Sequence, residues 1–186
     1  MEEFSLFVLD ITMNSVRAGA DKIDVTLTEE GDFLTFSVTD NGCGMTNEQV
    51  EKLSDPFFTT RKTRGVGLGV PFLKMLSEQT GGALKIESRA AAEHPMDHGT
   101  TITASFGINH IDFIPLGDMV GTVITLIQGN PNIDFTYEHI TSKGTVHLSC
   151  SELRAVLGDD ISLASFEILD WIRGYLTEGY ESLRNN

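Results

Sequence analysis

The stretch Asp40-Asn41-Gly42-Cys43-Gly44-Met45 and the later stretch Arg64-Gly65-Val66-Gly67-Leu68-Gly69 are the parts of this sequence that decide its fold. In the first, an aspartate follows an alternating apolar pattern and stands beside two glycines. Glycine has no Cβ, so the backbone can pass close to a ligand. Backbone amides at the start of a helix bind anions. The two stretches together indicate a pocket that takes a flat base at one end and phosphates at the other.

Composition and charge narrow the kinds of partner. The chain has 186 residues, of which 40% are hydrophobic and 22% charged, so it fits one large domain or a standard domain with a smaller appendage. Its net charge of -14 disfavours nucleic acid, because unspecific binding to phosphate backbones needs the opposite sign. An acidic surface instead favours a basic protein partner.

The cysteines and the N-terminus bear on the compartment. Cys43 and Cys150 have no metal or disulfide spacing, which favours a reducing compartment. The start, Met1-Glu2-Glu3, is acidic where a signal peptide would be basic, and no apolar run reaches membrane-spanning length. We therefore expect a soluble cytoplasmic protein without a membrane segment.

The first expected helix covers residues 4 to 19. Its apolar residues fall on one stripe at about 100° per residue. Asp10, Asn14 and Arg17 fall on a neighbouring stripe. One helix can therefore bury one flank and direct three polar groups into a cleft.

The remaining patterns predict an α+β fold, because the strands do not alternate strictly with helices. We expect strands over 23–27 and 34–38, a short helix from Thr46 to about Leu53 with a capping box, and a helix from about Pro71 to Gly81. Two strands follow, one containing Leu84 and Ile86 and one over 102–106. From residue 108 onward we expect a separate piece with helix 118–128, strands 133–139 and 144–149, and helices 151–157 and 165–184.

The polar residues of these elements suit an adenine nucleotide. Asp40 can accept a proton of the exocyclic amine of adenine, while Gly42 and Gly44 let the base approach. Asn14 offers a neutral oxygen of the kind that suits Mg²⁺. Asp10, one turn earlier, can orient an attacking water molecule. ATP and Mg²⁺ are therefore the expected cofactors.

The phosphates need local cations, since the chain as a whole is acidic. Arg17 and Lys62 can neutralise phosphate charge, although Arg17 also suits an ordinary surface position. The amides of residues 67–69, at the start of a helix, form an anion site. Taken alone, Asp-Asn-Gly is usually a turn, and Cys43 is a small residue within it. The nucleotide interpretation depends on the motifs occurring together.

Four motifs in the correct order resemble the GHKL superfamily, which includes gyrase, mismatch-repair ATPases, a heat-shock chaperone family and sensor histidine kinases. Asp10-x-x-x-Asn14-Ser15 matches the asparagine box, residues 40–45 match the first glycine box, and residues 65–69 match the second. Residues 55–60, Asp-Pro-Phe-Phe-Thr-Thr, resemble the phenylalanine box of sensor kinases. Gly99-Thr100-Thr101 resembles the last box, whose threonine contacts adenine through water.

The resemblance covers residues 1–107 and implies the Bergerat fold, a two-layer sandwich of a mixed, mostly antiparallel sheet and helices. ATP would lie between the sheet face and a lid at residues 57–66. Residues 108–186 would form a C-terminal α/β extension, either packed on the sheet or standing apart. The resemblance implies Asp10 as the catalytic residue, Asn14 as the Mg²⁺ ligand, and the following ATP-binding residues: Asn14, Arg17, Asp40, Gly42, Gly44, Met45, Phe57, Lys62, Gly65, Gly67, Leu68, Gly69 and Thr100.

Two departures from the family pattern affect the expected activity. Asp10 stands where the family has glutamate, and a misplacement of about 1 Å can cost on the order of 100-fold in rate. The sequence begins at the asparagine-box helix, so we expect no preceding dimerising helix with a phospho-accepting histidine, and none of the five histidines has that context. We therefore expect a kinase-like ATPase whose phosphate acceptor lies on a separate partner protein. One alternative is a nucleotide-gated binding module with little turnover. The other is a mismatch-repair-like ATPase, because the sequence of residues 14–27 resembles that branch of the superfamily.

Overall fold

The computed structural model describes residues 3–53, 69–158 and 161–185. The elements in chain order are α1 (Phe4–Arg17), β1 (Lys22–Glu30), β2 (Phe33–Asp40), α2 (Asn47–Leu53), α3 (Gly69–Gln79), β3 (Leu84–Arg89), β4 (Gly99–Gly107), α4 (Met119–Gly129), β5 (Asp134–Thr141), β6 (Gly144–Ser149), α5 (Cys150–Leu157) and α6 (Phe166–Asn185).

Local sequence signals set the ends of several of these elements. The capping box predicted before α2 is present: the Thr46 amide donates to Gln49 Oε1 at 2.8 Å, and the Gln49 amide donates to Thr46 Oγ1 at 3.4 Å. Asp118 caps α4 by accepting a 2.7 Å hydrogen bond from the Gly121 amide. The predicted α+β class is confirmed, with helices and strands where the periodicities indicated them.

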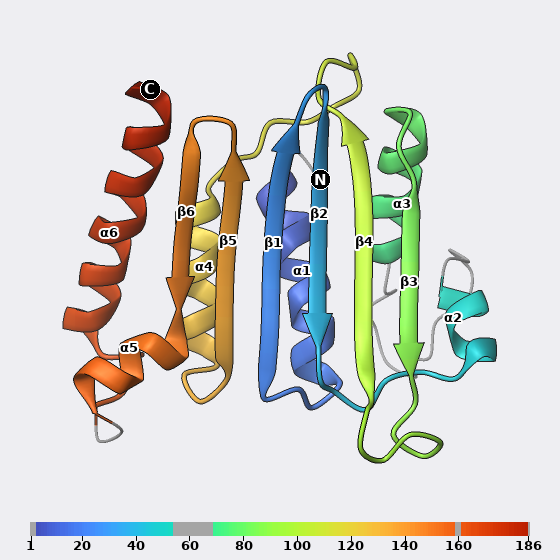
Figure 1. Ribbon diagram of the computed structural model, residues 1–186, viewed down its shortest axis with the longest axis horizontal. Coiled ribbons are helices and arrows are strands. Elements are labelled where there is room, and N and C mark those ends of the chain that lie inside the picture. The colour runs from blue at the N-terminus through green and yellow to red at the C-terminus, as the bar shows by residue number, and fades with distance from the viewer. Residues whose placement is uncertain (1–2, 54–68, 159–160, 186) are drawn as a thin grey trace.

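The described strands form one six-stranded sheet in the order β3-β4-β2-β1-β5-β6 (Figure 1). The β1–β5 pair is parallel, with Val25 opposite Tyr137, and the other four pairs are antiparallel. A parallel pair needs a crossover connection, and the segment from β4 through α4 supplies it. The sheet is therefore mixed and mostly antiparallel, as expected from the family resemblance.

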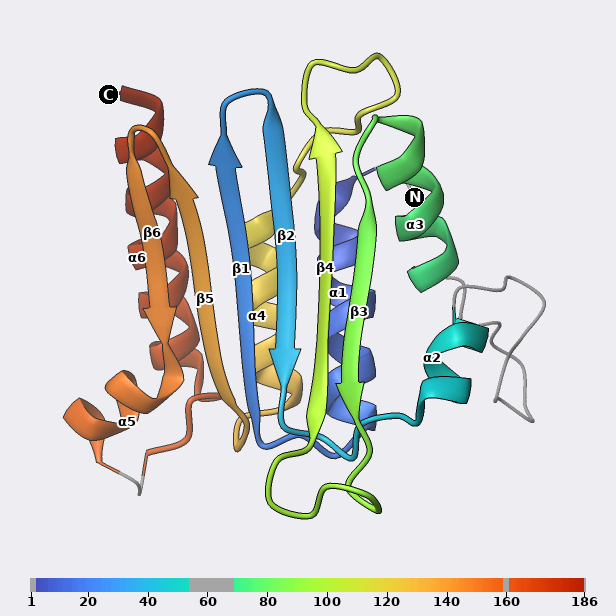
Figure 2. The ribbon, with the colours of Figure 1, turned by 45° about the vertical axis from the view of Figure 1, so that its right-hand side comes forward.

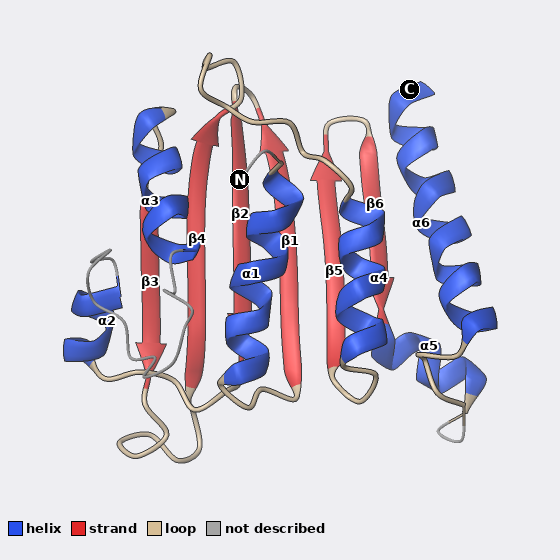
Figure 3. Ribbon diagram, turned by 180° about the vertical axis from the view of Figure 1, so that it is seen from behind, coloured by secondary structure: helices blue, strands red, loops and turns tan. Residues whose placement is uncertain are grey.

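Helices cover one face of the sheet. Seen from behind, α1, α3 and α4 lie in front of the strands (Figure 3), and in the turned view of Figure 2 α1 and α4 lie behind the strands. Inward-facing strand residues alternate with outward ones, which places the core between sheet and helices. Phe4 of α1 marks its centre, since its ring makes edge contacts with Phe36 and Phe106 at centroid distances of 5.5 and 5.1 Å.

The C-terminal segment continues this sheet and this core. Strand β5 pairs along β1, and Val123 and Ile127 of α4 belong to the same buried cluster as Ile23 and Leu27 of β1. Of the two arrangements left open by the sequence, the structure shows the first, in which the segment packs as an extension of the sheet. Helix α6 contacts both α4 and β6 and lies at the β6 edge of the sheet, opposite the edge formed by β3 (Figure 1).

Candidate functional site

The predicted base-recognition residues lie side by side at one end of the sheet. The strand register places Asp40, the last residue of β2, opposite Thr100 of β4, and Thr100 opposite Ser88 of β3. Asp40, Thr100 and Ser88 therefore form a row across three neighbouring strands. Asp40 bonds to α1, so its carboxylate is on the face that carries the helices.

Two donors hold the Asp40 carboxylate. Ser15 Oγ of α1 donates a 2.6 Å hydrogen bond to Asp40 Oδ2, and the Gly42 amide donates a 2.9 Å bond to Asp40 Oδ1. Each carboxylate oxygen can accept a further hydrogen bond. The side chain is thus fixed in direction and still able to accept from a ligand.

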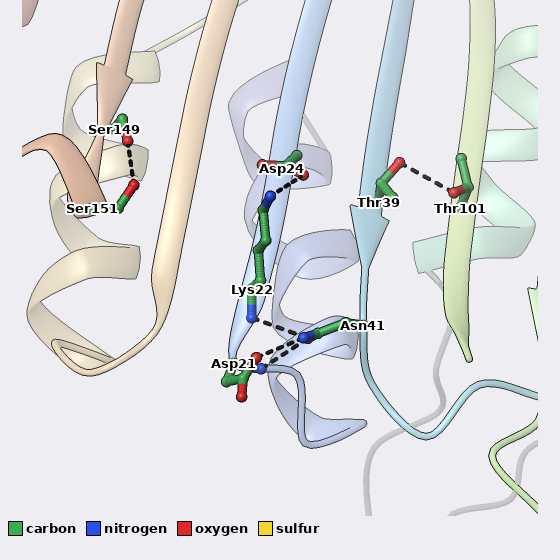
Figure 4. Close-up of polar contacts among 8 residues, drawn as sticks. All are labelled: Asp21, Lys22, Asp24, Thr39, Asn41, Thr101, Ser149 and Ser151. Atoms are coloured by element: carbon green, nitrogen blue, oxygen red, sulfur yellow. Dashed lines mark hydrogen bonds and ion pairs between the residues drawn. The ribbon is translucent and has the colours of Figure 1, made fainter. Parts of the chain in front are cut away.

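The neighbouring Asn41 has a different task. Its Oδ1 accepts from the amides of Asp21 and Lys22 at 3.1 and 3.0 Å, and its Nδ2 donates to Asp21 Oδ1 at 2.6 Å (Figure 4). These bonds fasten the start of β1 to the end of β2. On the helix-free face above them, Thr39 and Thr101 join β2 to β4 with a 3.1 Å contact between hydroxyls.

Glycines around the site make room for the protein's own backbone. Gly44 has φ +62°, and a methyl group there would overlap the Arg89 carbonyl oxygen. Gly99 has φ +139°, and a methyl group there would overlap the Asp40 carbonyl oxygen. At Gly42 an added Cβ would lie 2.8 Å from the Ala18 Cβ. The sequence suggested close approach by a base, whereas these glycines first allow close approach of the glycine-box loop to α1, β3 and β4.

A serine that the sequence analysis did not single out joins this loop to the row. Ser88 Oγ accepts a 2.8 Å hydrogen bond from the Met45 amide, donates to the Gly99 carbonyl at 3.0 Å, and lies 2.8 Å from Thr100 Oγ1. Ser88 follows the inward alternation of β3, but its partners depend on the register with β4. His98 adds a second link, with Nδ1 2.6 Å from the Gly42 carbonyl oxygen.

Asp10 and Asn14 come from α1, as predicted. The carboxylate of Asp10 lies against the first residue of α3, since a methyl group at Gly69 would overlap Asp10 Oδ2. Asn14, one turn later, accepts a 2.9 Å hydrogen bond through Oδ1 from the Arg17 guanidinium. Asp10 thus lies at the start of α3, and Asn14 and Arg17 are joined to each other toward the C-terminal end of the same helix.

The side chains of the described residues show what kind of metal ion the site could bind. Within residues 3–53, 69–158 and 161–185, no three His, Cys, Asp or Glu side chains are grouped to hold one. Asn14 Oδ1 keeps a second lone pair beside its bond to Arg17. This fits Mg²⁺, which takes few protein ligands and completes its shell with water and phosphate oxygens.

The row borders a hollow of about 540 Å³ between α2, β3 and β4. Asp40, Ser88 and Thr100 line it, and the exposed Arg89–Asp97 ion pair stands at its rim. A hollow of about 620 Å³ between α4, α6 and the β5–β6 turn is larger but contains none of the predicted site residues. The smaller hollow is therefore the better candidate for the base.

Of the predicted residues, the structure places Asp10 against Gly69 and Asn14 against Arg17, and at the base end it brings together Asp40, Gly42, Gly44, Met45 and Thr100. The remaining predicted residues lie outside the described part of the chain: Phe57, Lys62, Gly65, Gly67 and Leu68. The lid and the phenylalanine box at residues 55–66 lie there as well.

A family model confirms the resemblance. Residues 3–110 match the family described as histidine kinase-, DNA gyrase B-, and HSP90-like ATPase. The chain belongs to this ATPase family. Residues 3–110 are a histidine kinase-type ATP-binding domain, homologous to part of the sensor kinases below.

Curated relatives of this ATP-binding domain include a sensor histidine kinase and a sporulation kinase. Sensor histidine kinase ZraS of Escherichia coli O157:H7 is 36% identical over 83 residues, which cover 44% of this chain and 18% of that protein. Sporulation kinase B of Bacillus subtilis (strain 168) is 31% identical over 99 residues, covering 52% of this chain and 22% of that protein. The match therefore spans about a fifth of the length of these relatives, 18% and 22%.

Solved structures show the same fold over more of the chain. The Aquifex aeolicus MutL ATPase domain complexed with ADP has a TM-score of 0.55 at 17% identity, covering 100% of this chain and 70% of that one. The N-terminal domain of a DNA repair protein has a TM-score of 0.56 at 20% identity, covering 80% and 53%. The likeness to MutL thus includes β5, β6 and α6. Among the described residues, no helix is both long and apolar enough to cross a membrane.

Proposed function

We propose that the domain binds ATP with its adenine in the hollow beside the Asp40–Thr100–Ser88 row. The observation that carries this proposal is the Asp40 carboxylate, which Ser15 and Gly42 hold at 2.6 and 2.9 Å while both oxygens can still accept. A fixed carboxylate at this place suits the exocyclic amine of adenine, which offers two hydrogens.

The phosphates would extend from the base toward α1 and the start of α3. Asn14 would be the protein ligand of a Mg²⁺ ion, and Arg17 would approach the phosphates from the same helix. When bound, the ion supplies charge neutralisation at the phosphate oxygens. Lys62 and residues 65–68 remain proposed phosphate contacts on the strength of the family motifs.

We propose further that the chain transfers the terminal phosphoryl group to a separate protein in signalling. The bond between the γ-phosphorus and the β–γ bridging oxygen breaks, a bond to the acceptor side chain forms, and ADP leaves. Asp10 would take the proton of the attacking group, and hydrolysis results when that group is water. The homology to sensor kinases supports this reading, and the short carboxylate at position 10 favours slow turnover.

The decisive experiment measures binding and turnover on the same protein. Calorimetry with Mg-ATP should give saturable binding to the wild-type chain and a loss of at least about 100-fold in affinity for Asp40→Asn, since an amide places a donor where two donors already point. Circular dichroism should show that Asp40→Asn keeps its helices and strands. Unchanged ATP affinity in that variant would refute the assignment of Asp40.

Turnover is then measured as release of ADP and appearance of phosphoprotein with a cognate receiver protein. An Asn14→Ala variant serves as the control that lacks the proposed metal ligand. The variant gives the background level of ADP and phosphoprotein. If the wild-type chain produces neither above this background, it does not act as a kinase or ATPase. Nucleotide binding alone would then remain.

A further inference from the structure

Ser88 has more hydrogen-bond partners than its single proton can serve, so only one of the two oxygens beside it can accept from it. Its hydroxyl lies within 2.8 Å of the Met45 amide nitrogen, 3.0 Å of the Gly99 carbonyl oxygen and 2.8 Å of Thr100 Oγ1. An amide N–H can only donate, and a carbonyl oxygen can only accept. Ser88 therefore accepts from Met45, and its one proton can go to the Gly99 carbonyl or to Thr100 Oγ1.

The contact between Ser88 and Thr100 takes its direction from this choice, since either hydroxyl can be the donor. When Ser88 donates to Gly99 it has no second proton, and Thr100 then donates its own hydroxyl hydrogen to the remaining lone pair of Ser88. In that arrangement the hydroxyl of Thr100 is left with lone pairs alone. Thr100 lines the 540 Å³ hollow, so it presents an acceptor to whatever lies there.

Asp40 presents the same polarity from the adjacent strand. Its two oxygens already accept from Ser15 and Gly42, and a carboxylate has only acceptors to offer. Because Thr100 lies opposite Asp40 in the register, two acceptors line the same end of the hollow in that arrangement. A ligand group with two hydrogens satisfies both, whereas a carbonyl oxygen satisfies neither.

We propose that Ser88 donates to Gly99 and is thereby a specificity-determining residue, which keeps Thr100 as an acceptor and so makes the site discriminate an amino group from a carbonyl group on the purine. Ser88 also lines the hollow, but the proposed effect acts through Thr100, so Ser88 is a positioning residue. The proposal rests on the proposed binding of adenine beside Asp40. It concerns the bond network of Ser88, which the family motifs do not include.

A purely structural role for Ser88 predicts a different outcome. The hydroxyl also ties the glycine-box loop to β3 through Met45, so its removal can weaken every ligand of this hollow equally. Loss of polarity control, by contrast, lets the Thr100 hydroxyl rotate and donate to a carbonyl. The ratio of two affinities separates these effects, because a general weakening cancels in it.

The test uses ATP and inosine triphosphate, which carries a carbonyl in place of the exocyclic amine. Dissociation constants of both are measured for wild type, Ser88→Ala and Ser88→Thr. The matched control is Ser105→Ala, because Ser105 bridges the same strand pair through the Ala83 amide at 3.1 Å but lies outside the lining of the hollow. Ser88→Cys, with a weakly bonding thiol of similar size, serves if Ser88→Ala does not fold.

The expected result is that wild type prefers ATP and that Ser88→Ala lowers this preference by about tenfold, the usual scale of one hydrogen bond. Ser88→Thr should restore most of the preference, and Ser105→Ala should leave it unchanged. Equal weakening of both nucleotides in Ser88→Ala, or an unchanged ratio, overturns the role of Ser88 while leaving ATP binding intact. Failure of the wild type to bind either nucleotide overturns the proposed function itself.

Discussion

Ser15 Oγ lies 2.6 Å from Asp40 Oδ2 and joins the first helix to the end of β2 across 25 residues of sequence. Ser15 directly follows Asn14, so the residue that would hold the metal and the residue that orients the purine-binding carboxylate share one helical turn. A shift of α1 would therefore move both ends of the proposed nucleotide site together.

Ser15→Ala should weaken ATP binding about threefold to tenfold and lower the free energy of unfolding by about 1 kcal/mol, because Asp40 loses one of its two donors. Calorimetry and urea denaturation measure the two effects. Ser5→Ala is the matched control, since Ser5 is buried in the same helix and its hydroxyl bonds to Glu3 at 3.4 Å. Equal loss of ATP affinity in both variants would contradict a specific role for Ser15.

Gly69→Ala should reduce turnover by about 10-fold to 100-fold while changing ATP affinity by less than about threefold. The added methyl group overlaps the far end of the Asp10 side chain, which can rotate away and so leaves the fold intact but moves the carboxylate. Steady-state ADP release and calorimetry measure the two quantities.

Gly174→Ala is the control for Gly69→Ala, because this glycine lies inside α6 and nothing lies within 4 Å of an added Cβ. It should keep full activity and raise stability by about 1 kcal/mol through helix propensity. If Gly69→Ala turns over ATP at the wild-type rate, the carboxylate of Asp10 is not the proton acceptor.

Acidification should destabilise the protein through His139, which is 2% exposed. Its Nε2 lies 3.0 Å from Glu29 and its Nδ1 3.0 Å from the Tyr180 hydroxyl. Burial lowers the pKa of His139 below its usual 6.5, although Glu29 acts in the opposite direction. Burial also raises the pKa of Tyr180 to about 12, so this hydroxyl stays protonated.

Because the unfolded chain takes up this proton first, the stabilising contribution is complete above pH 6.5 and is lost as the pH falls from there toward the lowered folded value. Urea denaturation at several pH values gives the free energy of unfolding as a function of pH. Below pH 6.5 this free energy should fall more steeply for wild type than for His139→Gln, by at most about 1.4 kcal/mol per pH unit. His94→Gln, at an exposed position, should keep the wild-type slope. Identical slopes in wild type and His139→Gln would show that His139 does not titrate with folding.

A chain truncated after Gly117 should lose cooperative unfolding. The cut removes β5 from the edge of β1 and takes Val123 and Ile127 out of the shared core. Ile23 and Leu27 of β1 are then exposed to water, which costs about 25 cal/mol of stability for each Å² of apolar surface exposed. Thermal melting by circular dichroism measures this. A truncated chain that melts cooperatively and binds ATP would support residues 1–107 as an independent domain, as the division in the sequence suggested.

The sequence by itself determined the element order, the α+β class and the family, because each rests on local signals. Alternation marks strands, a 3.6-residue period marks helices, and the glycine boxes have fixed spacing. It also placed Asp10 and Asn14 on one stripe of α1, since helical geometry relates residues four apart. The pairing of β1 with β5 could not be read in this way, because a parallel pair between positions such as Val25 and Tyr137 leaves no local mark.

Only the tertiary structure decided what surrounds the Asp40 carboxylate. Register fixes which side chains stand opposite one another, and register follows from the burial of whole strands rather than from any single residue. That is why Thr100 lies between Asp40 and Ser88, and why its hydroxyl lies 2.8 Å from that of Ser88. The same cause places the glycines of the first box against α1 and the Arg89 carbonyl, contacts that only the packing of distant elements creates.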